Sequence, residues 1–263
     1  MQERKYLKNV SVKTLSWYQQ SFQAFDGCST ESDYKNRIVA LRDRGIKPIS
    51  INTYARCINA YLKWKNAPFK LPRLKEEQKI LATFSPEQVA RIVHGKPVGR
   101  NQTRIHTAAI TAMDTGIRIN ELLGLRRTDV DFDNLILKVL GKGNKHRLVP
   151  MSIELRKVLY RYLSKHNFPL VFCTQHGTQL TQRNSDRDLK LFLRKVGGLE
   201  NVRCSFHTFR HTFAVNYLRK GGNLYYLQRI LGHSTITTTE KYLKSLGIAD
   251  LLKVHDGLSL LAR

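Results

Sequence analysis

Residues 115–122 read Thr-Gly-Ile-Arg-Ile-Asn-Glu-Leu, and this stretch sets the pattern for the second half of the chain. A helix is expected over 101–114 and another over 118–126, with Gly116 ending the first of them. Arg118 therefore lies at a tight helix–helix junction, where a packed stem allows its planar guanidinium to be aimed at the oxygens of a phosphate. A surface or ion-paired arginine is the alternative interpretation of this position.

Two segments rich in β-forming residues follow, over 135–140 and 146–150. They flank the turn Gly141-Lys142-Gly143-Asn144, so we expect a β-hairpin here. Lys142 stands between two glycines, where packing gives little reason for a lysine. It is a candidate functional cation, and a solvated turn charge is the alternative.

The sequence His207-Thr208-Phe209-Arg210-His211 opens a helix expected over 207–220. His207 and Arg210 are three residues apart, so they lie on one helical face and can converge on one anion. His211 is expected to face a different side of this helix and to be structural.

Leu231-Gly232-His233-Ser234 closes a helix expected over 223–231, and Tyr242 follows nine residues after His233 on a helix expected over 235–243. A single tyrosine is usually half-buried core, so Tyr242 becomes a candidate only in combination with the other motifs. Tyr225 and Tyr226 precede His233 in an apolar helix, and we expect neither to be a nucleophile.

The N-terminal part is expected to be a separate helical domain. Aromatic and aliphatic residues recur there at spacings of three and four, which predicts amphipathic helices whose rings belong to a core rather than to a base-stacking surface. Residues 66–79 hold two prolines and many charges without a clear period, which is typical of a linker. Ser85-Pro86-Glu87-Gln88 then starts a new helix. The expected helices of the first domain span 11–27, 33–44 and 50–65.

Two more helices, over 152–165 and 183–196, complete the expected elements. The predicted fold class is mainly α with a small β-hairpin or sheet, an α+β chain. We expect one domain over 1–75 with a linker to about 82, and a second over 83–263.

Charge points to the partner. The chain carries 45 Lys and Arg against 20 Asp and Glu, a net charge of +25, and residues 1–75 alone hold 15 basic and five acidic side chains. Such a field favours binding to a polyanion, of which nucleic acid is the commonest in a cell. A ribosomal-type RNA binder or a merely soluble basic protein would also fit the charge.

Several other classes find no support in the sequence. It contains no run of about 18 apolar residues and begins without the apolar core of a secretory signal, so a cytoplasmic protein that does not enter membranes is expected. The four scattered cysteines lack zinc-site spacing and are interpreted as reduced structural thiols. Phosphate-loop, dinucleotide-binding and H-E-x-x-H motifs are missing, and acidic residues are sparse in the C-terminal half. We therefore expect no metal and no cofactor. Breakage of a phosphodiester would have to rely on organic cations.

The motifs T-G-I-R-I-N-E-L, G-K-G-N-K-H-R-L-V-P, H-T-F-R-H and L-G-H-x8-Y together resemble the tyrosine recombinase (phage integrase) family in order and spacing. The resemblance covers about 83–245, and the hairpin motif is most similar to Xer-type recombinases and integrases of mobile elements. Residues 11–65 resemble the family's helical core-binding domain by position and pattern alone. Asn120 stands where the family often has serine or another small residue, which puts little in doubt. The resemblance implies six catalytic residues: Arg118, Lys142, His207, Arg210, His233 and Tyr242.

The same resemblance implies a role for each of them. Tyr242 would attack the scissile phosphate to form a 3′-phosphotyrosyl bond, with His207 assisting as acid or base. Arg118 and Arg210 would clamp the non-bridging oxygens, and Lys142 would protonate the leaving 5′-oxygen.

His233 would bind the phosphate or hold the tyrosine in place. Glu121 is expected to orient Arg118 or to cap its helix. Neither metal nor ATP is needed for this chemistry, because the phosphotyrosine retains the energy of the broken bond.

The implied assembly is a clamp of both domains around double-stranded DNA, with four protomers on two duplexes. The tail 246–263 would pack on a neighbouring protomer or on its own domain, and accessory or directionality proteins would act on a cytoplasmic, nucleoid-associated complex. Two rival functions are a type IB topoisomerase-like relaxase and a non-catalytic DNA-binding protein of the same fold.

Overall fold

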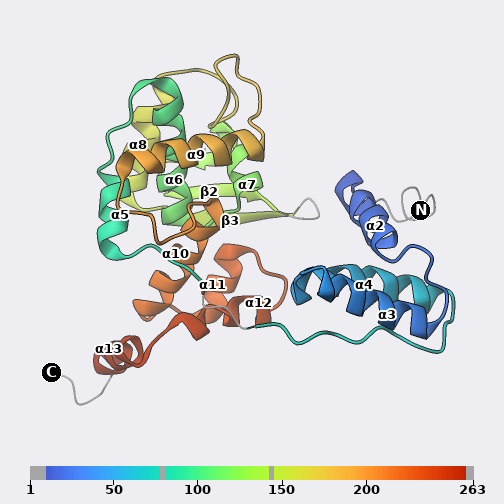
Figure 1. The fold of residues 1–263 in the computed structure, drawn as a ribbon. Coiled ribbons are helices and arrows are strands. Elements are labelled where there is room, and N and C mark those ends of the chain that lie inside the picture. Colours follow the sequence, from blue (N-terminus) through green and yellow to red (C-terminus); the bar gives the residue numbers. More distant parts are fainter. Residues whose placement is uncertain (1–9, 78–80, 142–144, 259–263) are drawn as a thin grey trace. The chain divides into compact units, whose positions relative to one another are not determined.

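The computed structural model describes residues 10–77, 81–141 and 145–258. The chain divides into two compact units, Met1–Lys79 and Ile80–Arg263. Each unit has a hydrophobic core of its own. Figure 1 shows the helices and strands of each unit.

Within residues 10–77, the first unit has three helices, and local sequence signals mark their starts. Ser11 caps α2 by accepting a hydrogen bond from the backbone N–H of Thr14, and Thr30 and Asp33 form a capping box at the start of α3. The third helix, α4, has Pro48 in its first turn. Their apolar faces meet in one core, which confirms the expected helices. The helices span Val12–Ala24 (α2), Glu31–Asp43 (α3) and Pro48–Trp64 (α4).

Two asparagines of α4 hold the segment that follows it. The side chain of Asn59 donates to the carbonyl of Leu71 (3.0 Å) and accepts from its N–H (2.7 Å). Asn52, seven residues and two turns earlier, makes the same pair of bonds with Leu74 (2.9 and 2.8 Å). Within the expected linker, residues 71–77 form no helix or strand, and the two side chains replace the missing backbone partners.

The second unit is built around α6, whose sides are packed against α8, α9 and α10. Nine of the 17 residues of α6 are buried, so it is apolar or internally bonded nearly all round, as a central helix must be. The helices of this unit are α5 (Pro86–Val93), α6 (Gly99–Thr115), α7 (Ile119–Leu123), α8 (Ile153–Leu163), α9 (Gln182–Val196), α10 (Phe206–Arg219), α11 (Leu224–Leu231), α12 (Thr237–Glu240) and α13 (Ile248–Leu258).

A three-stranded antiparallel sheet covers one side of this unit. It contains β1 (Val130–Asp131), β2 (Ile136–Leu140) and β3 (His146–Pro150) in that order, with Leu137 paired to Val149 and Val139 to Arg147. The expected hairpin is confirmed, and alternate residues of β2 face the core. The two-residue strand β1 has too short a pattern to be expected from sequence. Lys142, on the turn, lies outside the described residues.

Two expected helices are shorter in the structure. The helix expected over 118–126 ends at Leu123, since Gly124 follows it and the chain then enters a short 3₁₀ turn. The helix expected over 235–243 is only α12, and Tyr242 lies between it and the 3₁₀ turn Leu243–Ser245. Threonines 235 and 237–239 explain this, because β-branched hydroxyl residues favour helix formation poorly and bond locally instead.

No helix in the described ranges is long and apolar enough to cross a bilayer. Likewise, the described part of the chain has no cluster of three or more His, Cys, Asp and Glu side chains arranged to hold a metal ion.

Candidate active site

Gly116 and Glu121 together determine where Arg118 points. Gly116 ends α6 with φ +63°, and a Cβ there would lie 2.4 Å from the ring of Phe213, so only glycine fits this turn. Arg118 follows in extended backbone as the N-cap of α7. Glu121 accepts from the backbone N–H of Arg118 (2.7 Å) and from its Nη1 (2.9 Å). Glu121 therefore does both things expected of it: it caps the helix and orients the arginine.

Arginines from three distant segments bind to the C-terminal end of α11. The last carbonyls of a helix carry partial negative charge and have no partner inside the helix, so they attract cations. Each arginine reaches a different carbonyl: Arg147 Nε donates to Ile230 (2.9 Å), Arg210 Nη2 to Leu231 (2.8 Å) and Arg118 Nη2 to Gly232 (3.1 Å).

Arg210 is the most buried of the three, at 5% exposure. Its Nη1 also donates to the carbonyl of Gly116 (2.7 Å), and its Nη2 lies 2.8 Å from Nε2 of His233. Burial, followed by repulsion from Arg118, lowers its pKa to about 10. The guanidinium remains charged at pH 7, held mainly by uncharged acceptors, and so keeps a positive field for an incoming anion.

His233 joins the arginines to the tyrosine. Because Arg210 can only donate, Nε2 of His233 accepts, and the ring proton is on Nδ1, which donates to the hydroxyl of Thr239 (2.9 Å). Burial and the charge of Arg210 lower the pKa of His233 to about 3. The His233 ring is therefore neutral, with its proton on Nδ1.

Tyr242 is buried next to these residues, at 1% exposure. Its ring lies nearly parallel to that of His233 (12°), with centroids 6.3 Å apart, and Lys241 Nζ lies 5.2 Å from the centroid of the Tyr242 ring. Burial raises the pKa of the Tyr242 phenol, while the charges of Arg210 and Arg118 oppose that rise. The structure thus brings Arg118, Arg210, His233 and Tyr242 together.

His211 contacts Tyr242, which the sequence did not indicate. Its Nδ1 lies 3.4 Å from the hydroxyl oxygen of Tyr242, and the two ring centroids are 5.6 Å apart. Although His211 does leave the face of Arg210, the segment that carries Tyr242 packs against α10 and meets it there. Burial, then Lys241, lowers the pKa of His211 to about 4. Lys241 and His211 are therefore site residues that the sequence analysis missed, and no motif spacing signals either contact.

His207 and the hairpin complete the site. His207 lies in the first turn of α10, one turn before Arg210 and exposed to solvent. Partial burial and the charge of Arg210 lower its pKa, which leaves a neutral ring able to accept a proton at pH 7. Gly141, the residue before Lys142, lies against the side chains of Arg147 and Glu121: a Cβ there would be 3.4 Å from Arg147 Nη1 and 4.0 Å from Glu121 Oε1.

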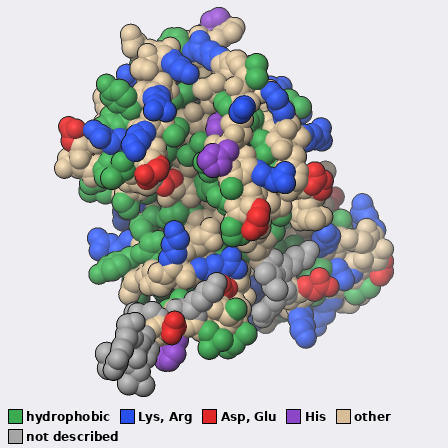
Figure 2. All heavy atoms as spheres, turned by 90° about the vertical axis from the view of Figure 1, so that its left-hand side faces the viewer, with side chains coloured by type: hydrophobic (Ala, Val, Ile, Leu, Met, Phe, Trp, Pro, Cys, Tyr) green, Lys and Arg blue, Asp and Glu red, His purple; other side chains and the backbone are tan. Residues whose placement is uncertain are grey.

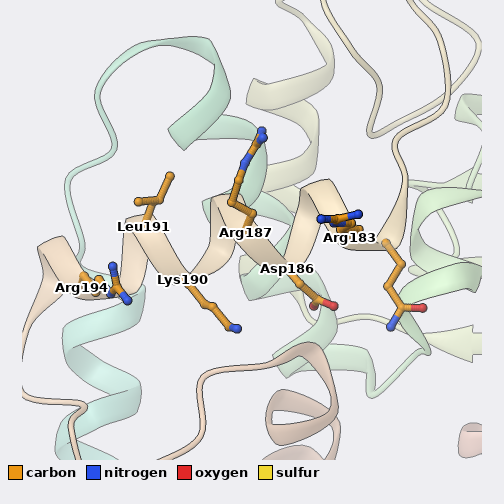
Figure 3. A pocket seen from close by; sticks show the side chains of 7 residues that line it. Arg183, Asp186, Arg187, Lys190, Leu191 and Arg194 are labelled. Atoms are coloured by element: carbon orange, nitrogen blue, oxygen red, sulfur yellow. The ribbon is translucent and has the colours of Figure 1, made fainter.

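Basic side chains also line a shallow groove along α9. The groove has a volume of about 670 Å³ and its lining includes Arg183, Arg187, Lys190 and Arg194, spaced four, three and four residues apart on one helical face (Figure 3). Asp186 is the acidic residue among them. Figure 2 shows lysine and arginine side chains spread across the face that it draws. The lining of the α9 groove thus carries four basic side chains and one acidic side chain.

Comparison with known proteins agrees with this geometry. The phage integrase family matches residues 82–247. Tyrosine recombinase XerD of Lacticaseibacillus casei is 34% identical over 183 residues, 66% of this chain and 61% of that protein, so this chain spans less than two thirds of its length. Tyrosine recombinase XerC of Bacillus pumilus is 27% identical over 270 residues, 89% of this chain and 87% of that protein.

The fold is shared with the Tn1549 transposon integrase (aa 82-397), whose structure was solved in complex with circular intermediate DNA. The TM-score is 0.79 at 21% identity, with 98% of this chain and 97% of that one covered. Because the family match extends over more than half of the sequence, the chain belongs to the phage integrase family.

Proposed function

We propose that this protein is a site-specific DNA recombinase that cuts and rejoins DNA strands through a 3′-phosphotyrosyl bond to Tyr242. One observation carries the proposal: Arg118, Arg210 and His233 come from separate segments and meet beside a buried tyrosine. A phosphodiester needs two things to be cleaved without hydrolysis, a nucleophile and cations for the non-bridging oxygens. This cluster supplies both.

In the proposed reaction, the Tyr242 oxygen attacks phosphorus as the bond to the 5′-oxygen breaks. The phenol must lose its proton during attack, because burial raises its pKa, and His207 would take part as acid or base. Arg118 and Arg210 hold the non-bridging oxygens, and Lys142 donates a proton to the 5′-oxygen. Rejoining reverses the step: a 5′-hydroxyl attacks the phosphotyrosine and releases the tyrosine, with no net consumption of ATP and no metal required.

The DNA partner is proposed from charge. The net charge of +25 and the basic face of α9 both suit a phosphate backbone, and the Tn1549 integrase of the same fold was solved with DNA. We propose residues 1–75 as a core-type DNA-binding domain, with a linker to about 82, and 83–263 as the catalytic domain, closing on the duplex as a clamp. A cytoplasmic, nucleoid-associated protein would follow.

The proposed assembly is a tetramer on DNA, with α13 as the contact. Arg219 Nε lies 3.2 Å from Asp250, which ties the start of α13 to α10 of its own unit. The apolar residues Ile248, Leu251 and Leu252 remain exposed, and such a row of apolar side chains suits a neighbouring protomer. Accessory or directionality proteins would act on that assembly.

The test is a covalent adduct formed in EDTA. Nicked duplexes tiled across the DNA flanking the gene should trap the wild-type protein on one of them, seen as a shifted band on a denaturing gel. Tyr242→Phe should lose the adduct and keep DNA binding. Absence of any wild-type adduct would favour a non-catalytic DNA-binding protein. Plasmid relaxation without exchange between two sites would favour a type IB topoisomerase-like enzyme.

A further inference from the structure

The geometry points to Arg147 as a positioning residue of strand transfer, which keeps Arg118 in place for the phosphate by binding Glu121 and the end of α11. The inference rests on the proposed function and gives a role to a residue that lies in the G-K-G-N-K-H-R-L-V-P motif but had none assigned to it. Arg147 lies on β3, opposite Val139.

The contacts of Arg147 leave it little capacity to bind phosphate itself. Its Nη1 and Nη2 donate to the two carboxylate oxygens of Glu121, each at 2.8 Å, and its Nε donates to the carbonyl of Ile230. Its side chain is only 14% exposed. All three guanidinium nitrogens are thus bound inside the protein, so Arg147 acts through its neighbours.

Glu121 is shared between two arginines, and this sharing explains what Arg147 does. Oε1 accepts from Nη1 of both Arg147 and Arg118, and Oε2 accepts from Nη2 of Arg147 and the backbone N–H of Arg118. Burial acts to raise the pKa of Glu121, but the bonds from Arg147 and then Arg118 outweigh it and lower the pKa. With Arg147 removed, a buried carboxylate would be left to Arg118 alone and would draw that guanidinium toward itself.

Arg147 also supports the backbone to which Arg118 and Arg210 bind. Gly232 has φ +63°, and a Cβ there would lie 2.9 Å from Arg147 Cζ, so the guanidinium lies directly against this residue. On its other side is Gly141, next to the hairpin turn. One side chain therefore links the hairpin that carries Lys142, the carboxylate that orients Arg118, and the end of α11.

The experiment compares two substrates in single-turnover cleavage of a nicked duplex. One has the natural scissile phosphate, and the other a methylphosphonate, in which a methyl group replaces a non-bridging oxygen and removes its charge. Arg147→Gln and Arg147→Lys should slow cleavage of the phosphate about 100-fold, the loss typical of a small misplacement, because lysine cannot bind a carboxylate in two places. The methylphosphonate should be cleaved with a smaller loss, as for Arg118→Ala, and DNA affinity should be unchanged.

The matched control is Arg127→Gln. Arg127 also donates to carbonyls at the end of a helix, those of Leu163 and His166, from its Nη1. Its removal should leave the ratio of the two cleavage rates at the wild-type value.

A double substitution tests the sharing of Glu121. Arg147→Gln with Glu121→Gln should cleave phosphate faster than Arg147→Gln alone, because the carboxylate that would capture Arg118 is gone. Additive losses in the double variant, or equal losses on both substrates, would overturn the positioning role. Full activity of Arg147→Gln beside a wild-type adduct would overturn this inference alone, whereas a wild type that forms no adduct on either substrate would overturn the proposed function as well.

Discussion

The two sides of the candidate site are held in different ways. On the arginine side, three guanidinium groups donate to peptide carbonyls over 2.8 to 3.1 Å. On the tyrosine side, Tyr242 is held by ring contacts, by a contact of 3.4 Å from its hydroxyl to His211 and by an interaction of its phenol with Arg210. Charge-assisted hydrogen bonds fix the direction in which a side chain points. Ring packing keeps a side chain buried but allows its ring to rotate more easily. The cations are therefore organised before DNA arrives, and the tyrosine is the part that can adjust.

On the arginine side, substitution of Arg210 should have the largest effect on cleavage. Arg210→Ala should lower the rate of cleavage about 1,000-fold, in line with the loss of a preorganised cation, and should lower the free energy of unfolding by about 3 kcal/mol because buried carbonyls lose their donor. Single-turnover cleavage and urea unfolding measure the two effects.

Arg104→Ala is the control for Arg210. Arg104 is equally buried, at 5% exposure, and donates to the carbonyl of Cys173 and to Asp188. The Arg104→Ala variant should lose a similar amount of unfolding free energy. Its folded fraction should cleave DNA at a rate near that of the wild type. Equal losses of cleavage in the two variants would show that Arg210 acts through stability alone.

The backbone of the arginine side can be tested at Gly116. Gly116→Ala should cost roughly 3 kcal/mol of unfolding free energy, because a Cβ would combine a left-handed φ with a clash against Phe213. Gly221→Ala, at φ +79° with open space around it, should cost only about 1 kcal/mol. Urea unfolding of the two variants separates the effect of the steric clash from that of backbone strain. Similar losses of unfolding free energy in both would contradict the tight junction at Gly116.

The histidines that flank Tyr242 should make the fold sensitive to acid. Unfolded histidine titrates near 6.5, but the pKa is about 4 for His211 and about 3 for His233 in the fold. Below pH 6.5 the unfolded chain therefore binds more protons than the folded one, and stability present above 6.5 is lost as the pH falls toward 4 and then 3. The slope approaches about 1.4 kcal/mol per pH unit for each such proton.

Urea unfolding from pH 7 to pH 4 measures this slope. His211→Asn and His233→Asn should each reduce it, while substitution of the exposed His176 by Asn should not. A slope unchanged in both site variants would show that these rings are protonated in the fold.

The smallest expected effect is on the tyrosine side. His211→Asn should slow cleavage roughly fivefold, the worth of one modest hydrogen bond, because packing against His233 still holds the Tyr242 ring. Single-turnover cleavage with the phosphate substrate measures it. A loss as large as that of Arg210→Ala would abolish the distinction between the two sides and make His211 a catalytic residue.

Much of the fold follows from local signals in the sequence. Ser11, Thr30 and Ser85 begin helices, Gly116 and Gly232 end them, and the hairpin follows from its β-formers. These signals are local, so neighbouring residues are enough to read them. The helix expected over 235–243 is shorter in the structure, and its threonines have a weak helix propensity that the expected span did not take into account.

The motifs predicted several side chains of the candidate site but not the contacts that these side chains make. Arg118 and Arg210 can be recognised in the sequence by their motifs. The carbonyl groups of α11 that accept their hydrogen bonds cannot, because every residue has a backbone carbonyl. Arg147 and His211 acquire their partners through contacts across 26 and 31 positions of the chain. The basic face of α9 was within reach, since the spacing of Arg183, Arg187, Lys190 and Arg194 already places them in one row.

The use of peptide carbonyls at the end of α11 has a consequence for genetics. No codon change can delete a main-chain oxygen, so the side chains of Ile230 and Leu231 are free to vary in size as far as packing allows, and the acceptors stay. Vulnerability to mutation falls on the three donors and on Gly232, whose backbone shape no other residue adopts without strain. A screen for inactive variants should therefore recover the three arginines and Gly232, whereas at Leu231, which is buried in the core, it should recover only changes that disturb packing.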